Sequence, residues 1–216
     1  STPQAKKRRA DRTFRDDQLD MGFFIALLVV HLPPGKVLLS LDRTNWEHGE
    51  TPINFLVLGA VVHGFTLPLI WVPLDDSGNS HTYARMWLVL KLLRALPAKR
   101  WLGLVADREF IGAEWFRFLR RHGIKRAIRI RHSDMLDDMS GKEWFEHVQH
   151  GHFHEIAEKV FVFGELMRVV ATRSPTGDLV IIATDFSARK TWKLYKQRWS
   201  IECTFSSFKK RGFDLE

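Results

Sequence analysis

The sequence predicts a mixed α/β fold, and three observations support that prediction. Short apolar runs alternate with longer helical segments between residues 36 and 130, and Gly or Pro stands at several of the junctions. Two of the apolar runs are followed directly by an aspartate, Asp42 in one case and Asp107 in the other. With 216 residues, 8 Trp and 16 Phe, the chain can bury one full core.

The N-terminal segment, residues 1–35, is predicted to be a basic tail followed by a helix. The helix is expected over 16–32, and the Pro-Pro-Gly sequence at 33–35 ends it. Its apolar run, 21–30, is too short to cross a bilayer and follows acidic residues instead of a signal-peptide n-region. We therefore predict a core helix and no membrane partner. The basic residues at 6–9 could touch DNA, although a solvated tail is the simpler interpretation.

Residues 36–130 are predicted to form the first part of the core domain. The run 36–41 is a predicted strand with Asp42 at its C-terminal end, and residues 43–46 are expected to turn the chain.

A hairpin is predicted next. Two apolar runs, 53–62 and 65–74, are separated by His63-Gly64, and with the first strand they would form an antiparallel meander. The third strand contains Pro68 and Pro73, which have no backbone N–H to donate, so we expect it at a sheet edge.

An α/β unit follows the meander. We predict a helix over 81–96, a strand over 101–106 that leads to Asp107, a helix over 111–122 and a strand over 125–130. If the two strands followed by aspartates are parallel neighbours, both carboxylates emerge at the same sheet edge.

Residues 131–184 are predicted to form a β-rich insertion. A polar, histidine-rich stretch is followed by strands near 158–163, 166–173 and 178–184. Alternate histidines on one strand face can bind zinc or nickel, but an exposed polar face explains them as well. The histidines in question are His147, His150, His152 and His154.

The last segment, residues 185–216, is predicted to contain a helix with a polar stripe. At about 100° per residue, Tyr195, Arg198, Glu202 and Lys209 fall within an arc of about 60°. A polar stripe between two apolar flanks indicates a site, although a glutamate on an amphipathic helix is more commonly solvated surface. The flanks are Leu194, Ile201, Phe205 and Phe208 on one side and Trp192, Trp199 and Cys203 on the other.

Three acids stand out in this arrangement: Asp42, Asp107 and Glu202. Phosphodiester cleavage with magnesium needs oxygen ligands that hold two cations about 4 Å apart, and two or three clustered carboxylates suffice. Taken singly, Asp42 could be a turn former and Asp107 could cap the following loop.

The spacing Y-(2)-R-(3)-E-(6)-K, formed by Tyr195, Arg198, Glu202 and Lys209, resembles the signature of bacterial DDE transposases of the insertion-sequence-four group. The same helix contains the R-W-x-I-E run of that family at 198–202.

The resemblance extends over nearly the whole chain. The family places its first acid in a D-x-T context and its second after the fourth strand; here these positions read Asp42-Arg43-Thr44 and Asp107-Arg108-Glu109-Phe110. It also has a β insertion before the glutamate helix, where residues 131–184 lie. The two ends of the chain look truncated, so we expect a catalytic-domain fragment.

By this resemblance the fold is ribonuclease-H-like and the activity is cut-and-paste DNA transposition. A metal-bound water would nick one strand at the element's end, the freed 3′ hydroxyl would close a hairpin on the opposite strand, and the reopened end would be joined to target DNA. The resemblance implies two Mg²⁺ ions, for which Mn²⁺ can substitute. Asp42 would bridge the ions, and Asp107 and Glu202 would each complete one.

The resemblance also implies double-stranded DNA as partner, both transposon ends and target, and a homodimer in the synaptic complex. Tyr195, Arg198 and Lys209 would contact phosphates, and Lys210 and Arg211 would extend the same basic end. A net charge of +8 and a pI near 9.8 also favour an anionic partner. One cysteine excludes an internal disulfide and fits a reducing cytoplasm. The resemblance implies a bacterial protein associated with the nucleoid.

The insertion departs from the family pattern in one respect. Family members stack a flipped base on an aromatic residue of the insertion, and here no tryptophan follows Trp144 within that segment. Phe161 and Phe163 are both candidates, and both could equally belong to the core of a strand.

Four other residues receive structural interpretations. Cys203, Trp46 and Trp115 are expected in the core, and Glu109 is expected to pair with a neighbouring arginine instead of serving as a spare metal ligand.

Two alternatives to a transposase remain open on the sequence. One is a metal-dependent nuclease of the same fold without strand transfer, and the other is an inactive remnant that only binds DNA. The presence of all three acids argues against loss of activity by point mutation.

Overall fold

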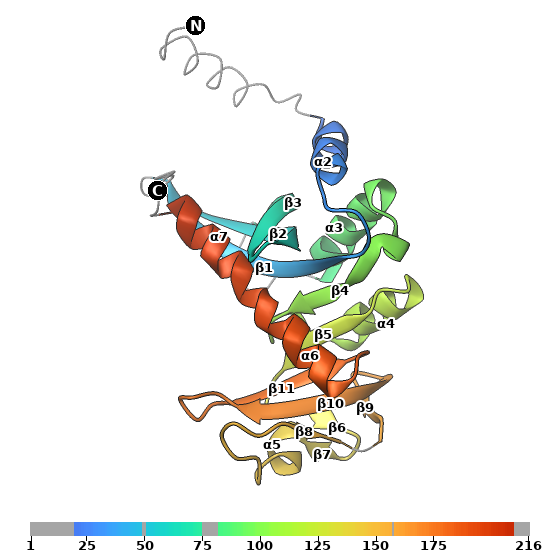
Figure 1. The fold of residues 1–216 in the computed structure, drawn as a ribbon, viewed down its shortest axis with the longest axis vertical. Helices are drawn as coiled ribbons and strands as arrows, with labels where there is room; N and C mark the ends of the chain where they lie inside the picture. The colour runs from blue at the N-terminus through green and yellow to red at the C-terminus, as the bar shows by residue number, and fades with distance from the viewer. Residues whose placement is uncertain (1–19, 49–50, 75–81, 157, 210–216) are drawn as a thin grey trace, which may run out of the picture.

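The computed structural model describes residues 20–48, 51–74, 82–156 and 158–209. A central mixed sheet has the strand order β3-β2-β1-β4-β5-β11-β10-β8, with β9 paired to β10 and β6 paired to β7 in a separate ribbon (Figure 1). The strands are β1 (Val37–His48), β2 (Thr51–Val62), β3 (Phe65–Leu74), β4 (Trp101–Ala106), β5 (Arg126–Ile130), β6 (Met135–Leu136), β7 (Met139–Ser140), β8 (His154–Glu155), β9 (Val160–Val162), β10 (Glu165–Arg173) and β11 (Leu179–Thr184). The helices are α2 (Met21–Val30), α3 (Thr82–Ala95), α4 (Ala113–Arg121), α5 (Gly141–Trp144), α6 (Ala188–Tyr195) and α7 (Trp199–Lys209), with 3₁₀ turns η1 (Ala98–Arg100) and η2 (Lys196–Arg198). The predicted α/β class is confirmed.

The first strand is longer than predicted. β1 pairs with β2 from Leu38 to His48, so Asp42 stands within the strand, and the prediction that residues 43–46 turn the chain is wrong. The physical reason is that β2 extends far enough to supply hydrogen-bond partners to this polar stretch of backbone, which local propensity does not reveal.

The β2–β3 hairpin is confirmed. His63 and Gly64 both adopt positive φ, 49° and 89°, as a two-residue hairpin turn requires. β3 lies at the end of the strand order, so the prediction of an edge strand containing Pro68 and Pro73 is also confirmed.

The strands that lead to the two aspartates are parallel neighbours, which is the condition under which the sequence places both carboxylates at one sheet edge. β1 pairs with β4 in parallel, with Leu41 opposite Ala106, and β4 pairs in parallel with β5. Asp42 is the next residue of β1 and Asp107 is the first residue after β4, so their carboxylates leave neighbouring strands at the same level of the sheet.

Helices cover the sheet on both faces (Figure 1). α3 and α4 pack on one face, where Leu39, Leu41, Leu88, Trp115 and Phe116 belong to a large buried cluster. α6 and α7 cover the other face with two smaller clusters. One contains Leu38, Val105 and Tyr195, and the other contains Val57, Ile201 and Phe205.

Residues 131–184 are continuous with the central sheet. β11 pairs antiparallel with β5, with Ile181 opposite Ile130, and β10 pairs antiparallel with β11. The segment is β-rich and precedes the last helices, as predicted, but its two longest strands widen the sheet. Its boundaries at 131 and 184 stay a prediction.

The C-terminal helix differs from the prediction in two ways. The 3₁₀ turn η2 lies between α6 and α7, so Tyr195 and Glu202 belong to different helices. One predicted flank is correct, since Leu194, Ile201 and Phe205 are buried. The other is correct only at Trp192, which is partly buried and packs against the cluster of Leu38 and Val105. Cys203 is exposed and Trp199 is 61% exposed, so the prediction of a core cysteine is wrong. The sheet packs against the Ile201 side, which leaves these two residues facing outward.

The described helices include none that is both long enough and apolar enough to cross a membrane.

Candidate active site

The three predicted acids line a single open cavity of about 520 Å³, called here the carboxylate cavity. Asp42 comes from β1, Asp107 from the residue after β4, and Glu202 from α7. The other lining residues are Arg43, Thr44, Asn45, Glu109, Arg198, Phe205, Ser206 and Lys209.

Strand alternation explains why the two aspartates meet the helix. Successive side chains on a strand point to opposite faces. On β1, Leu38 packs beneath α6, and Asp42, four residues later, lies on the same face of the strand. On β4, Val105 packs on that face as well, and Asp107 follows two residues later.

Arg198 lies between two of the carboxylates. Its Nη1 is 2.7 Å from Glu202 Oε1 and 3.5 Å from Asp42 Oδ2, and its side chain is only 12% exposed. Burial alone would lower the pKa of the guanidinium, but Tyr195 and the carboxyl groups of Asp107, Glu202 and Asp42 raise it above its usual range. Arg198 therefore supplies a permanent positive charge at the centre of the acidic group.

Asp42 is the most perturbed of the acids. Burial raises its pKa from 3.8 to about 6, and the charges of Glu202 and Asp107 add to that rise. The backbone N–H of Arg43, which donates to Oδ1 at 2.8 Å, and the charge of Arg198 act in the opposite direction. A nearby cation stabilises the ionised form of a buried carboxylate, so binding of a cation would offset the free-energy cost of ionising Asp42.

Asp107 has a buried carboxylate oxygen that could still bind a cation. Its Oδ1 is buried and has no hydrogen-bond donor among the described residues; Arg129 Nη1 lies 3.8 Å away. A buried carboxylate oxygen without a hydrogen bond carries a desolvation cost that a bound cation would offset.

These residues suit a hard divalent cation by their chemistry, since three carboxylates face one cavity. As placed around Arg198, they are not gathered tightly: within the described residues, no three His, Cys, Asp or Glu side chains are close enough together to hold a metal ion.

The predicted DNA-contacting residues fall into three groups. Arg198 and Lys209 line the cavity, and Lys209 Nζ donates to the Asn45 carbonyl. Tyr195 is buried under the sheet face, where burial raises its pKa to about 12, and its ring lies 5.7 Å from the Arg198 guanidinium. Lys210 and Arg211 lie outside the described residues.

Sequence reasoning missed two arginines. Arg43 Nε lies 3.4 Å from Glu109 Oε1, which confirms the expected pairing of Glu109, and Arg129 faces Asp107 from the neighbouring strand β5. Alternation could have revealed Arg129, because Ala127 two residues earlier packs beneath α6.

The remaining candidates separate clearly. Phe161 is 58% exposed, whereas Phe163 packs edge-on against Phe116 with ring centroids 5.2 Å apart. The rings of His147 and His154 are 4.9 Å apart, and the histidine-rich segment holds no metal-binding group among its described residues. Trp115 is fully buried, as predicted, while the Trp46 side chain lies outside the described part of the structure.

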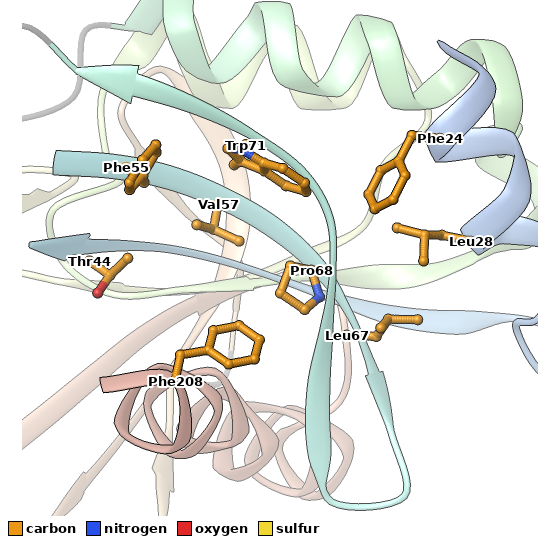
Figure 2. A pocket seen from close by; sticks show the side chains of 9 residues that line it. All are labelled: Phe24, Leu28, Thr44, Phe55, Val57, Leu67, Pro68, Trp71 and Phe208. Carbon is orange, nitrogen blue, oxygen red and sulfur yellow. The ribbon is translucent and has the colours of Figure 1, made fainter. Parts of the chain in front are cut away.

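An apolar hollow of about 290 Å³ adjoins the carboxylate cavity (Figure 2). Thr44 lines both spaces, and Phe208 of α7 faces Pro68 and Leu67 of β3 across the hollow. Its lining residues are Phe24, Leu28, Thr44, Phe55, Val57, Leu67, Pro68, Trp71 and Phe208.

The model of the transposase DDE domain family matches residues 33–216. The chain belongs to this family. The matched range includes Asp42, Asp107, the histidine-rich segment and Glu202. No curated protein matches the chain.

A transposase is also among the structurally similar proteins. The piggyBac transposase, solved as a synaptic complex with hairpin DNA, superposes with a TM-score of 0.55 at 10% identity over 85% of this chain and 42% of that one. The DDE domain thus has a ribonuclease-H-like fold, as predicted, and spans less than half the length of the piggyBac chain. Endonuclease V of Bacillus subtilis (TM-score 0.38, 11% identity, 88% of each chain) and the catalytic domain of human endonuclease V (TM-score 0.43, 10% identity, 100% of each chain) match more loosely.

Proposed function

We propose that this chain is the catalytic domain of a cut-and-paste DNA transposase of the insertion-sequence-four group, which hydrolyses phosphodiester bonds at the element's ends and joins them to target DNA. The observation that carries the proposal is the convergence of Asp42, Asp107 and Glu202 on one cavity from two parallel strands and a crossing helix. The unbroken Tyr195, Arg198, Glu202, Lys209 spacing supports assignment to that group.

The cofactor we propose is a pair of Mg²⁺ ions, for which Mn²⁺ can substitute. Asp42, Asp107 and Glu202 would hold them, and the ions when bound would activate the attacking oxygen and stabilise the leaving oxygen. The buried Asp107 Oδ1, which accepts no hydrogen bond from the described residues, and the raised pKa of Asp42 support a cation at this place.

The protein's own residues would orient the DNA. Arg198 and Lys209 are cationic groups on the cavity wall, within reach of a phosphate that enters it. Tyr195 is buried, so in this structure it supports the Arg198 guanidinium from below instead of facing the cavity. We further propose double-stranded DNA as the substrate, a homodimer as the working assembly, and the bacterial nucleoid as the location.

A metal-dependent nuclease without strand transfer is the nearest alternative, because the same three acids would serve it. Arg198 and Lys209 favour the transposase, since both are cationic residues of the signature that line the cavity with the carboxylates and would help to hold a transposon end.

The test is cleavage of a supercoiled plasmid by the full chain, with Mg²⁺, with Mn²⁺ and with EDTA. We expect metal-dependent nicking that falls by at least about 100-fold in Glu202→Gln, equivalent to about 3 kcal/mol of transition-state stabilisation. Glu114→Gln is the matched control, because Glu114 is an exposed carboxylate in the first turn of α4 on the opposite face of the sheet.

A second arm separates the transposase from the nuclease. A fluorescent duplex with free 3′ hydroxyl ends is added with the plasmid, and joined products are counted. Nicking without joining would favour the nuclease. Folded protein that binds the duplex but yields no metal-dependent product would overturn both the transposase and the nuclease hypotheses. The chain would then be a DNA-binding remnant.

A further inference from the structure

A buried group of hydroxyls joins α7 to the edge strand β3. Thr66, Ser200 and Thr204 are 0%, 7% and 7% exposed. Thr66 Oγ1 lies 2.6 Å from Ser200 Oγ, and Thr204 Oγ1 lies 3.1 Å from the Thr66 nitrogen and 2.9 Å from its carbonyl oxygen. Residues 134 and 138 positions apart in the sequence are thereby connected by side-chain hydrogen bonds.

The proton positions in this group follow from the partners. Ser200 Oγ donates its one proton to the Gln197 carbonyl at 2.7 Å, so Thr66 Oγ1 donates to Ser200 Oγ. Thr204 Oγ1 accepts from the Thr66 N–H and shares its own proton between the carbonyls of Thr66 and Ser200, the latter at 3.0 Å. Every hydroxyl in the group has a donor or acceptor partner, so the contact is directional.

This contact also satisfies backbone groups of the edge strand β3. Thr66 uses its backbone N–H and carbonyl for Thr204, and these groups on an edge strand would otherwise lack a partner in a buried place. The same hairpin has a register shift between Leu58 and Gly59. The absence of a side chain at Gly59 lets β3 approach closely there, because an added Cβ would lie 2.5 Å from Thr66 Cγ2 and 2.7 Å from the Leu67 carbonyl oxygen.

The hydroxyls lie on the side of α7 away from the site. Ser200 and Thr204 are each two residues from Glu202, and at about 100° per residue both point about 160° away from it. Apolar contacts of Ile201 and Phe205 with Val57 hold the helix to the sheet but are non-directional. Rotation of α7 about its axis would break the hydroxyl bonds and turn the Glu202 carboxylate out of the cavity.

We propose that Thr66, Ser200 and Thr204 form a hydroxyl latch that fixes the rotation of α7 and thereby positions Glu202 as a ligand in the carboxylate cavity. The inference rests on the proposed role of Glu202 and adds positioning residues to it. The latch touches neither substrate nor metal and acts only through the helix.

The test compares Thr204→Val with Thr204→Ser in the full chain. Valine keeps the shape but removes the hydroxyl, whereas serine keeps the hydroxyl. Ser207→Ala is the control on the same helix, because Ser207 Oγ makes only the local bond to the Cys203 carbonyl, 2.9 Å, among the bonds of the described residues. Mn²⁺ binding is measured by the electron paramagnetic resonance signal of free Mn²⁺, and exchange of the Thr66 amide proton is followed by NMR.

We expect Thr204→Val to weaken Mn²⁺ binding by about 10-fold or more, as loss of a group that orients a ligand does, and to speed exchange at Thr66. Plasmid nicking should fall through kcat, with the KM for DNA unchanged. Thr204→Ser and Ser207→Ala should bind Mn²⁺ as the parent chain does. If Thr204→Val does not fold, Ser200→Ala removes one bond of the latch, and we expect a smaller loss of Mn²⁺ affinity in the same direction.

Two outcomes would overturn the latch. One is parental Mn²⁺ affinity in folded Thr204→Val, and the other is equal loss of affinity in Thr204→Val and Ser207→Ala. Failure of the proposed function looks different, because Glu202→Gln would then bind Mn²⁺ and nick DNA as the parent chain does.

Discussion

The two faces of the central sheet are built for different purposes. Beneath α3 and α4, one continuous cluster of fully buried side chains runs from Leu39 on β1 to Trp115 and Phe116 on α4. Beneath α6 and α7 the packing is divided into two small clusters, and the carboxylate cavity adjoins them. The face beneath α3 and α4 therefore contributes most of the buried apolar packing. The face beneath α6 and α7 has less continuous packing, and it carries the charged residues of the cavity.

The face beneath α6 and α7 contains buried polar groups that lower the stability of the fold. On the face beneath α6 and α7, burial opposes the ionisation of Asp42 and raises its pKa. Asp107 Oδ1 and Arg198 Nε are buried there and have no hydrogen-bond partner among the described residues. Unmet polar groups gathered at one place are expected at a functional site, where stability is exchanged for binding capacity.

The largest effect on stability is expected on the closed face. Trp115→Ala should lower the free energy of unfolding by about 3–5 kcal/mol, because Trp115 is fully buried and a large cavity would remain. Chemical denaturation measures the loss. Nicking per folded molecule should stay near the parental value at a temperature where the variant is folded. A selective loss of nicking in folded protein would contradict the division between the faces.

Asp107→Asn should show the reverse behaviour. Metal-dependent nicking should fall by about 100-fold or more, equivalent to about 3 kcal/mol. The unfolding free energy should stay within about 1 kcal/mol, because Asp107 Oδ1 has no hydrogen bond to lose and its ion pair with Arg129 is long, 3.8 Å. Paired nicking and denaturation assays check this, and a variant that nicks normally would remove Asp107 from the site.

The pH dependence of stability should reveal Asp42. Its folded pKa, about 6, exceeds its ordinary value, so between pH 4 and 6 the folded state binds more protons than the unfolded state and loses stability as the pH rises. Asp42→Asn lacks this loss. In EDTA we expect the variant to be more stable than the parent by about 1–3 kcal/mol at pH 8, with the gain fading below pH 4.

Urea unfolding at pH 4 and pH 8 measures that difference. Glu114→Gln, which alters an exposed carboxylate on the other face, is the matched control. Lower stability of Asp42→Asn at pH 8 would mean that the ion pair with Arg198 outweighs burial.

The smallest effect tests the exposed flank of α7. Cys203→Ser should change the unfolding free energy by less than about 0.5 kcal/mol, because the thiol is exposed. Denaturation under reducing conditions measures it. A loss above about 1.5 kcal/mol would restore the original prediction of a core cysteine.

Much of the fold followed from periodicity and turn chemistry. The Trp101–Ala106 strand and the His63-Gly64 hairpin were predicted from local signals, because each depends on residues close in sequence. The parallel pairing of β1 with β4 was only a condition in the sequence analysis, because it joins residues far apart in the sequence. The extension of β1 past Asp42 was missed, since it depends on pairing with β2.

Part of the site lay beyond sequence reasoning for the same reason. The spacing of Arg198 and Glu202 was readable, but their joint contact with Asp42 spans 156 positions for the Arg198 bond and needs the folded sheet. The burial of Tyr195 and the exposure of Cys203 depend on which side of the helix meets the sheet, and a helical wheel with apolar residues on both flanks does not decide that.

The edges of the sheet carry a consequence for solubility. An edge strand with free backbone groups is a template on which another chain can add a strand and begin to aggregate. Here β3 contains two prolines and gives its Thr66 backbone groups to α7, and β8 at the opposite end has only 2 residues. The same helix that presents Glu202 therefore also protects the longer border of the sheet from self-association.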